Sequence, residues 1–527
     1  MTITAPPLPV IAMNRLAFGP RPGDVDALAR RGLASWVDEQ LRPEEAADRD
    51  CRARLDAAKL RIRYGASPDW GLTDELRPLS MLDAPTASLW HLADNKQKMA
   101  GPERQRPRSE VAAATLIRAV HSHWQLREVL VDFWHNHFNV YALEPNVAVG
   151  LPAYDRDVIR AHCLGNFRAF LEAVATSSAM QVFLNNRSSR AGSANENYGR
   201  ELLELHTLGA PHYLNALYNR WREVPGAAQG KAAGYIDQDV YEAARAFTGW
   251  TLADGKDLGG GQKLPDTGAF QYAESWHDNY QKRVLGVEFD PFQAPMADGR
   301  RVLDLVAAHP GTAMFVCAKL VRRLVGDPVP EALVKEAAQV WTANRTRDDQ
   351  IARVVRVIAL SPIFARTWGD RVKRPLEVAA SFARATDIEM TASEGVLGEM
   401  DAAGQRLFGW APPTGHPDDT EYWLSSAVMR RRWSIVLGLA EGWWGTAPLQ
   451  PGRAMGGGSI TAERAVAYWL PRVVGSHAPP ETGAVILAAM KIAPDAVINN
   501  APPGKDPEPQ LRRLVAYCAM TPEFHYR

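Results

Sequence analysis

The chain has 527 residues, of which 46% are apolar, so it can bury a large core and is long for a single domain. Sixty basic and sixty acidic residues give a formal net charge of zero. This balance removes the electrostatic argument for binding to nucleic acid or to an anionic membrane surface. Nowhere do about twenty apolar residues run together, so we expect no transmembrane helix.

The cysteines and the first residues indicate the compartment. The four cysteines are far apart and form no Cys-x-x-Cys pair, which argues against a zinc ribbon and against a disulfide framework. We expect them to be reduced and buried. The first residues contain no cationic stretch followed by an apolar one, so we expect a soluble, cytoplasmic protein.

Most of the chain is expected to be helical, because apolar residues recur at spacings of three and four. In chain order, the predicted helices cover residues 24–41, 110–136, 154–175, 195–208, 239–248, 300–308, 311–325, 331–343, 348–360 and 425–440. Stretches rich in glycine, proline or charge, at 213–234, 254–267, 410–419 and 450–459, are expected to be loops.

These elements predict an all-α fold, a large multi-helix bundle with long irregular loops and at most a minor hairpin. We divide the chain into an N-terminal helical segment (1–100), a central helical region that carries the candidate site (101–300) and a C-terminal helical region (301–527).

The first concentration of reactive side chains lies at residues 127–139. On a continuous helix Glu128, Asp132 and His135 fall within about 60° of one another, so they form one stripe that could hold a metal. His137 lies about 200° from His135, so both can reach one metal only where the helix ends or distorts.

The second concentration is the run Asn-Glu-Asn-Tyr-Gly-Arg-Glu-Leu-Leu-Glu-Leu-His-Thr-Leu-Gly at residues 195–209. Helical spacing places Asn197, Glu201 and Glu204 on one face, beside a leucine stripe that can be buried. Acids at the border of a core require a positive partner or a metal. His206 would lie about 140° from Glu201 unless the helix has already ended.

Two further features complete the candidate set. His277 and Asp278 form a pair in a loop between helices, where they could act as a ligand, a proton shuttle or a loop staple. Lys373 belongs to a basic stretch that could hold an anionic group, neutralise the acidic helix or simply be a solvated turn. The chain contains no P-loop, no Rossmann fingerprint and no Gly-x-Ser-x-Gly elbow.

Several motifs, in order and over most of the chain, resemble the bacterial domain-of-unknown-function-1800 family. They are Asn-Arg-Leu-Ala-Phe-Gly-Pro at 14–20, Trp-Val-Asp-Glu-Gln-Leu at 36–41, Phe-Trp-His-Asn-His-Phe at 133–138, the acidic run at 195–209, Ala-Phe-Thr-Gly-Trp-Thr at 246–251 and Lys-Arg-Pro at 373–375.

The resemblance implies a mainly helical fold but no secure function. Positions that match its motifs are Asn197, Arg200, Glu201, Glu204, His137 and the His277-Asp278 pair. The chain departs from the family pattern in a longer stretch between 209 and 235 and in His416, where the family usually has tryptophan. Both departures could reshape a substrate cleft.

We therefore expect a metal-dependent enzyme, with an iron or copper oxygenase or hydroxylase as the leading hypothesis. The ligand pool comprises His135, His137, His206, His277, Glu128, Glu201 and Glu204, with Arg200, Asp278 and Lys373 as further catalytic candidates. A peptide or other sizeable substrate is the expected partner. A metal-dependent hydrolase that uses Glu201 or Glu204 as general base, and a non-catalytic helical scaffold in which arginines hold the acids, remain open alternatives.

Overall fold

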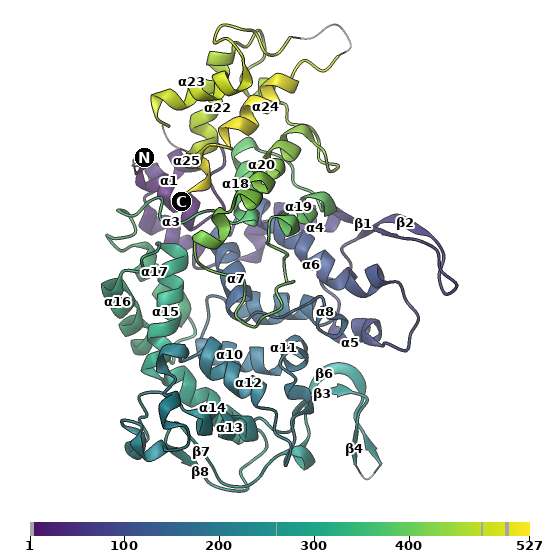
Figure 1. Cartoon of the computed structure of the whole chain (residues 1–527), viewed down its shortest axis with the longest axis vertical. Helices are drawn as coiled ribbons and strands as arrows, with labels where there is room; N and C mark the ends of the chain where they lie inside the picture. The colour runs from purple at the N-terminus through teal and green to yellow at the C-terminus, as the bar shows by residue number, and fades with distance from the viewer. Residues whose placement is uncertain (1–4, 260, 476–477, 501–504) are drawn as a thin grey trace.

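The computed structural model describes residues 5–259, 261–475, 478–500 and 505–527, and within them the chain is mostly helical (Figure 1). The N-terminal part contains α1 (Leu8–Arg15), α2 (Asp24–Arg31), α3 (Leu33–Gln40), α4 (Arg49–Ala57) and α5 (Thr86–Leu89), and the hairpin of β1 (Lys59–Tyr64) with β2 (Thr73–Pro78). This hairpin projects from the side of the molecule in Figure 1.

The central part carries the two motifs that the sequence singles out. Its helices are α6 (Gly101–His121), α7 (Gln125–His137), α8 (Pro145–Ala148), α9 (Leu151–Ala153), α10 (Phe167–Thr176), α11 (Ser178–Phe183), α12 (Glu196–Glu201) and α13 (Asp237–Ala246). Two π-helical segments, η3 (Tyr154–Arg160) and η5 (Leu202–His206), continue α9 and α12.

Three small antiparallel pairs follow α13. They are β3 (Trp250–Asp254) with β6 (Asp266–Tyr272), β4 (Asp257–Gly259) with β5 (Gln262–Lys263), and β7 (Lys282–Val284) with β8 (Val287–Phe289). With β1 and β2 they make four two-stranded sheets in the described part of the chain.

The rest of the chain is helical. It contains α14 (Ala297–Ala308), α15 (Pro310–Leu324), α16 (Glu331–Ala343), α17 (Gln350–Ala359), α18 (Pro375–Thr386), α19 (Glu394–Ala402), α20 (Ser426–Glu441), α21 (Pro451–Ala454), α22 (Ala462–Val474), α23 (Pro480–Met490), α24 (Pro509–Cys518) and α25 (Pro522–His525). Helix α18 packs against α6 of the central part and against α20 and α22.

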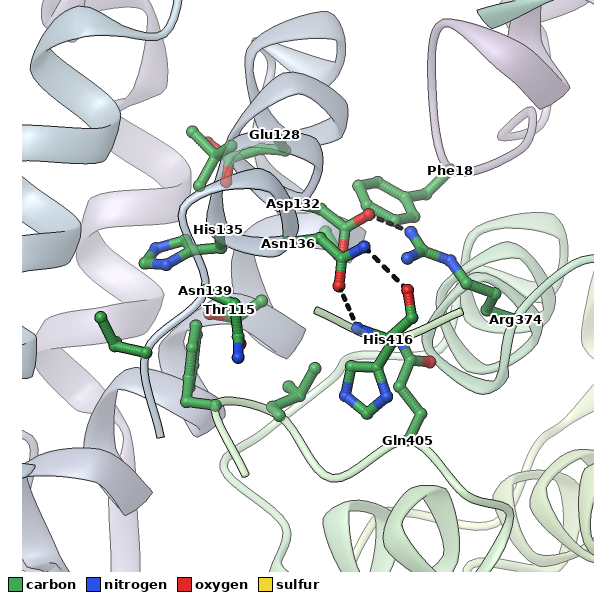
Figure 2. A pocket seen from close by; sticks show the side chains of 15 residues that line it. Phe18, Thr115, Glu128, Asp132, His135, Asn136, Asn139, Arg374, Gln405 and His416 are labelled. Atoms are coloured by element: carbon green, nitrogen blue, oxygen red, sulfur yellow. Dashed lines mark hydrogen bonds and ion pairs between the residues drawn. The ribbon is translucent and has the colours of Figure 1, made fainter. Parts of the chain in front are cut away.

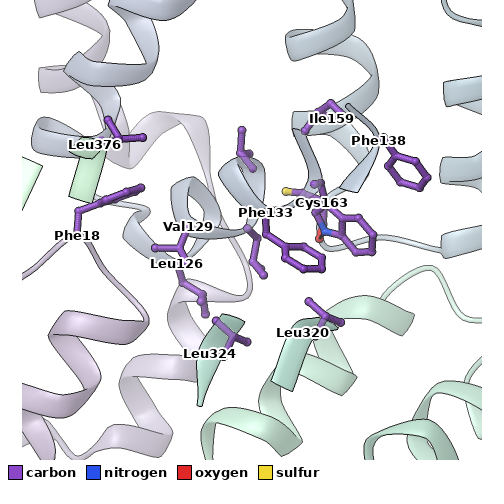
Figure 3. Packing of buried hydrophobic residues seen from close by; sticks show 14 of the residues in the cluster. Phe18, Leu126, Val129, Phe133, Phe138, Ile159, Cys163, Leu320, Leu324 and Leu376 are labelled. Atoms are coloured by element: carbon purple, nitrogen blue, oxygen red, sulfur yellow. Dashed lines mark hydrogen bonds between the residues drawn. The ribbon is translucent and has the colours of Figure 1, made fainter. Parts of the chain in front are cut away.

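Helix α7 crosses the hydrophobic core. In Figure 3, Phe133 of α7 lies between Leu320 of α15 and Cys163, which follows η3, and Phe138 lies near Ile159. The fully buried Trp134 donates a 3.0 Å hydrogen bond from its ring nitrogen to the carbonyl oxygen of Cys163. Burying large apolar side chains of this kind contributes about 1.5 to 3 kcal/mol each, so the core fixes the direction in which α7 presents its polar side chains.

The predicted helical character is confirmed, but the expected limit of one minor hairpin is wrong, since four strand pairs are present among the described residues. In β1 the signal is local, because Leu60 and Ile62 are buried while Lys59, Arg61 and Arg63 between them are exposed, which is the period of two of a strand. The three-part division of the chain stays a prediction.

Three predicted helices are interrupted, and the one expected at 154–175 breaks at residues 163–166, before α10. The helix expected at 24–41 breaks at Gly32, which has a φ of 84° and a ψ of 144°. The helix expected at 110–136 breaks between α6 and α7, where the carboxylate of Asp48 accepts 2.8 Å hydrogen bonds from the Ser122 hydroxyl and the His123 backbone. The partner from a distant segment satisfies the backbone at the break, which sequence periodicity cannot reveal.

All four cysteines are buried and free of disulfides, as expected. The stretch 213–234 is irregular and contains only single turns of 3-10 helix, η7 (Asn215–Leu217), η8 (Trp221–Glu223) and η9 (Ala227–Gln229). Among the described residues, no helix has both the length and the apolar character needed to cross a bilayer.

Candidate functional site

Helix α7 points polar side chains into a small cavity that it forms with α6 and the segment 405–416 (Figure 2). As the helical spacing predicts, Glu128, Asp132 and His135 all line this cavity. Its volume is about 40 Å³, which suits a few water molecules at most. The cavity is too small for a substrate, so the bonds of these side chains decide their role.

Glu128 and His135 belong to a buried charge network with η3. Arg160 donates 2.9 Å hydrogen bonds to both oxygens of Glu128 and to one oxygen of Asp155. The other oxygen of Asp155 lies 2.9 Å from Nε2 of His135. Burial opposes ionisation, but the charge of Arg160 outweighs it and holds the pKa of Glu128 below its usual value. This is the arginine pairing that the sequence left open, and it occupies atoms that a metal would need.

Asp132 is neutralised as well. It accepts hydrogen bonds from Arg374, and from Arg323 at 3.3 Å. Arg323 also lies 2.7 Å from Glu377, so the acids and arginines of α7, α15 and α18 form a second buried network. Neither network holds an acid without a cation.

Lys373 adjoins this network and is 4% exposed. Its Nζ lies 3.3 Å from the Ser381 hydroxyl and 4.2 Å from the centre of the Phe524 ring, and burial lowers the pKa of the amine to about 7. Its contacts are thus with α18 and α25. None of these contacts is with the acidic run at 195–209, so they do not support the predicted role of Lys373 in neutralising that helix.

Two asparagines at the end of α7 hold the segment 410–416, a role that the sequence did not indicate. Asn136 pairs with the backbone of His416 through hydrogen bonds of 3.0 and 2.7 Å, and Asn139 donates to the carbonyl oxygens of Trp410 and Pro412 at 3.0 and 2.8 Å. Gly415 has a φ of 74°, and a Cβ there would lie 2.2 Å from the Asn136 carbonyl oxygen. The close approach therefore requires glycine.

The acidic run at 195–209 is predicted to be one α-helix, but only its first part is α-helical. Asn195 caps α12 by accepting a 3.0 Å hydrogen bond from the backbone of Asn197, and the α-helix then widens into the π-helix η5. Angles worked out for a continuous α-helix therefore do not apply beyond Glu201. Gly209 ends the run with a φ of 85°, in agreement with the predicted glycine at the helix end. Segments of π-helix often occur at functional sites.

Glu201 and Glu204 are partly buried and differ from the acids of α7. No hydrogen bond or ion pair joins either carboxylate to another described residue, although Glu128 and Asp132 each have arginine partners. Burial, and then the charge of Glu204, raise the pKa of Glu201 to about 7. The pair therefore lacks the cation that its environment calls for.

Tyr235 adjoins this acid pair, and the sequence did not single it out. It is fully buried and its hydroxyl has no partner among the described residues. Burial raises the pKa of this hydroxyl, and the charge of Glu204 raises it further. The residue lies about thirty positions downstream, after the irregular stretch, so helical spacing could not connect it with Glu204.

Arg200 does not neutralise the pair. Its guanidinium lies 3.5 Å from Asp237 and 3.7 Å from Glu196. Asp237 also accepts a 2.7 Å hydrogen bond from the Tyr213 hydroxyl. Arg200 is therefore directed to the neighbouring acids.

His137 of α7 contacts His206 at the end of η5. Nε2 of His137 donates a 3.1 Å hydrogen bond to the carbonyl oxygen of His206, and the two ring centres are 6.3 Å apart. Both rings are buried, and Nδ1 of His137 and both ring nitrogens of His206 lack partners among the described residues. Burial, followed by the charge of Lys319, lowers the pKa of His206 to about 3 and that of His137 well below its usual value. Both rings are neutral, with unused nitrogen lone pairs.

His277 and Asp278 hold their loop in place. Nδ1 of His277 donates a 2.8 Å hydrogen bond to the carbonyl oxygen of Thr248, and its Nε2 lies 3.3 Å from Asp298. Asp278 accepts two hydrogen bonds from Arg245, at 2.8 and 3.0 Å. Of the roles that the sequence left open, these contacts fit the loop staple best.

The predicted site residues thus fall into separate groups. Glu128 and His135 lie in the α7 network, Lys373 in the C-terminal one and His277 with Asp278 in the loop; Glu201, Glu204, His137 and His206 occur around α12 and η5. Within the part of the chain that the structure describes, no three His, Cys, Asp or Glu side chains are arranged to hold a metal ion. Among the predicted ligands, those whose donor atoms lack partners in the described part of the chain lie around η5.

Comparisons with known proteins agree with the motifs. A family model described as "Protein of unknown function (DUF1800)" matches residues 11–526. No curated protein and no solved structure matches the chain.

Proposed function

The chain belongs to the domain-of-unknown-function-1800 family, and we propose that it is a metal-dependent enzyme whose centre is the pair Glu201 and Glu204. One observation carries the proposal: these two acids are partly buried without a cation, in an interior that supplies arginines to Glu128, Asp132 and Asp155. Unpaired acids in such a place are costly, which favours a role in binding a cation or a proton.

No group of three described side chains is already arranged to hold a metal ion, so the residues that would hold one are inferred from the unused donor atoms around η5. The carboxylates of Glu201 and Glu204 are partly buried and have no hydrogen-bond or ion-pair partner among the described residues, and His137 and His206 have unused ring nitrogens. Glu128 and His277 do not fit, because their donor atoms bond to Arg160, Thr248 and Asp298, whereas His135 has only its Nε2 bonded, to Asp155. A mixed set of carboxylate and imidazole suits iron, and the imidazoles also suit copper.

The leading proposal is an iron or copper oxygenase or hydroxylase. The metal would bind dioxygen or polarise the substrate. Glu201, with a pKa near 7, is able to accept a proton at neutral pH, and the buried Tyr235 hydroxyl is a donor without a partner among the described residues. A peptide or other sizeable substrate, and a cytoplasmic location, stay proposals from the sequence.

A metal-dependent hydrolase is the second candidate. It is favoured by the pKa of Glu201, because a carboxylate that exchanges its proton near neutral pH can serve as general base for a metal-bound water. It needs fewer imidazole ligands, since hard cations are often held by one or two carboxylates with water.

Metal analysis tests both proposals. Untagged protein should contain iron or copper in proportion to chain, or bind it after reconstitution, and Glu204→Gln should lower the content at least severalfold. Glu196→Gln is the matched control, because Glu196 lies in α12, directly before η5, but pairs with Arg200. If wild-type protein neither contains nor binds a metal, the proposal fails and a scaffold is favoured. With metal bound, substrate-dependent oxygen consumption separates the oxygenase from the hydrolase.

A further inference from the structure

A second site lies beyond the acidic segment. An open pocket of about 710 Å³ is lined by residues 230–233, α14 and the start of α15. Its volume is in the range of pockets that hold small organic molecules. One wall belongs to the irregular stretch 213–234, which the sequence marked as longer than the family pattern and able to reshape a cleft.

The lining carries an excess of positive charge. Lys231 and Arg301 line the pocket, both are exposed, and neither forms an ion pair with a carboxylate in the described part of the chain. The guanidinium of Arg301 lies 4.9 Å from the centre of the Phe289 ring, which supports its side chain from one side. The acid Asp304 also lines the pocket, but it is bound to Arg168 at 2.5 Å. The cations thus remain available to a ligand.

The remaining wall is apolar or already bonded. Leu285 and Leu305 contribute hydrocarbon surface, and His309 uses both ring nitrogens, one with the Ala232 carbonyl oxygen at 2.8 Å and one with the backbone of Gly311 at 2.9 Å. His309 therefore offers no free ring nitrogen to a ligand.

His212 adds an open acceptor. Its Nδ1 donates a 2.8 Å hydrogen bond to the carbonyl oxygen of Leu208, which leaves Nε2 with a lone pair beside Gly311. A Cβ on Gly311 would lie 2.8 Å from that nitrogen. The absence of a side chain there keeps the imidazole accessible at the pocket wall.

We propose that this pocket binds a small organic anion, with a carboxylate or phosphate group held by Arg301 and Lys231 and an apolar chain against Leu285 and Leu305. The charge of the lining selects the anionic head, and the leucines select the tail. The site is separate from the proposed metal centre and does not depend on it.

Calorimetric titration at low ionic strength tests the proposal with three probes that share one tail: hexanoate, hexyl phosphate and 1-hexanol. The full-length protein should bind at least one of the anions and bind 1-hexanol much more weakly. The better anion identifies the head group as carboxylate or phosphate. Arg301→Gln should weaken binding of that anion about tenfold, because it removes a charged hydrogen-bond donor.

Arg300→Gln is the matched control, since Arg300 lies next to Arg301 on α14 but pairs with Glu172 at 2.9 Å and does not line the pocket. It should leave the affinity unchanged, and both variants should melt at the wild-type temperature. The proposal is overturned if neither anion binds at millimolar concentration, if 1-hexanol binds equally well, or if the two variants weaken binding equally.

Discussion

Replacing Glu201 by Gln should stabilise the metal-free protein at pH 8. The pKa of this carboxyl is raised from 4.5 to about 7, chiefly by burial. Above pH 7 the folded protein must carry a charge that its surroundings disfavour, whereas the unfolded chain ionises freely. The stability that protonated Glu201 retains at low pH is therefore lost as the pH rises from 4.5 through 7. Glutamine cannot ionise and escapes this loss.

The magnitude follows from the pKa values. A change from 4.5 to about 7 corresponds to about 3 kcal/mol in the free energy of unfolding, at about 1.4 kcal/mol for each tenfold step. Because the side chain is only partly buried, screening by solvent reduces this to about 1 to 2 kcal/mol. Unfolding entropy of about 2.1 cal/mol/K per residue then gives Glu201→Gln a melting temperature about 1 to 2 °C higher at pH 8.

The measurement is thermal unfolding followed by intrinsic fluorescence, for which the chain provides sixteen tryptophans. A chelator keeps the protein free of metal, and the variant is compared with wild type at pH 5 and pH 8. The gain should shrink to a few tenths of a kcal/mol at pH 5. Glu336→Gln, on the exposed face of α16, should show no such difference. A variant that melts below wild type at pH 8 would show that an unseen contact stabilises the ionised carboxylate.

Three further predictions concern the metal, the α7 network and the segment 410–416. Manganese or ferrous ion added to chelator-treated protein should raise its melting temperature. At a metal concentration a hundred times the dissociation constant, the free energy of unfolding should increase by about 2.7 kcal/mol. Glu204→Gln should abolish this increase, and an equal increase in the variant would exclude the acid pair as the binding site. Asp155→Asn should cost about 3 to 5 kcal/mol in urea unfolding because Arg160 loses a buried partner, while Glu331→Gln, in an exposed pair, should cost less than about 1 kcal/mol. Asn139→Ala should expose residues 410–416 to faster proteolysis and cost about 1 to 3 kcal/mol, and unchanged cleavage would show that other contacts hold the segment.

Periodicity predicted what depends on neighbours in the chain. Glu128, Asp132 and His135 do share one face of α7, because a regular α-helix fixes their relative angles. The same calculation does not apply to His206, because the α-helix ends at Glu201 and the run continues as a π-helix, the condition under which the predicted angle is not expected to hold. Sequence spacing determines the angle between two side chains around the helix axis only while the helix type stays the same.

Partners from distant segments could not be predicted. Arg160 and Asp155 decide the state of Glu128 and His135, yet nothing in the sequence of α7 indicates which arginine arrives from η3. From the sequence, each acid in the two motifs could therefore be either a metal ligand or an ion-pair partner. The choice follows from tertiary packing, which assigns Glu128 to the second.

The acid pair stays unneutralised although an arginine is adjacent in sequence. The guanidinium of Arg200 instead pairs with two other acids. Glu196 lies one helical turn before Arg200, and Asp237 lies at the start of α13, where a hydrogen bond from Tyr213 fixes its position. A longer reach to Glu201 would leave Asp237 without its cation. The packing of α12 and α13 therefore leaves Glu201 and Glu204 without a neutralising cation, although Arg200 is adjacent in sequence. Such a deficit lowers stability and is expected where a site needs an open carboxylate.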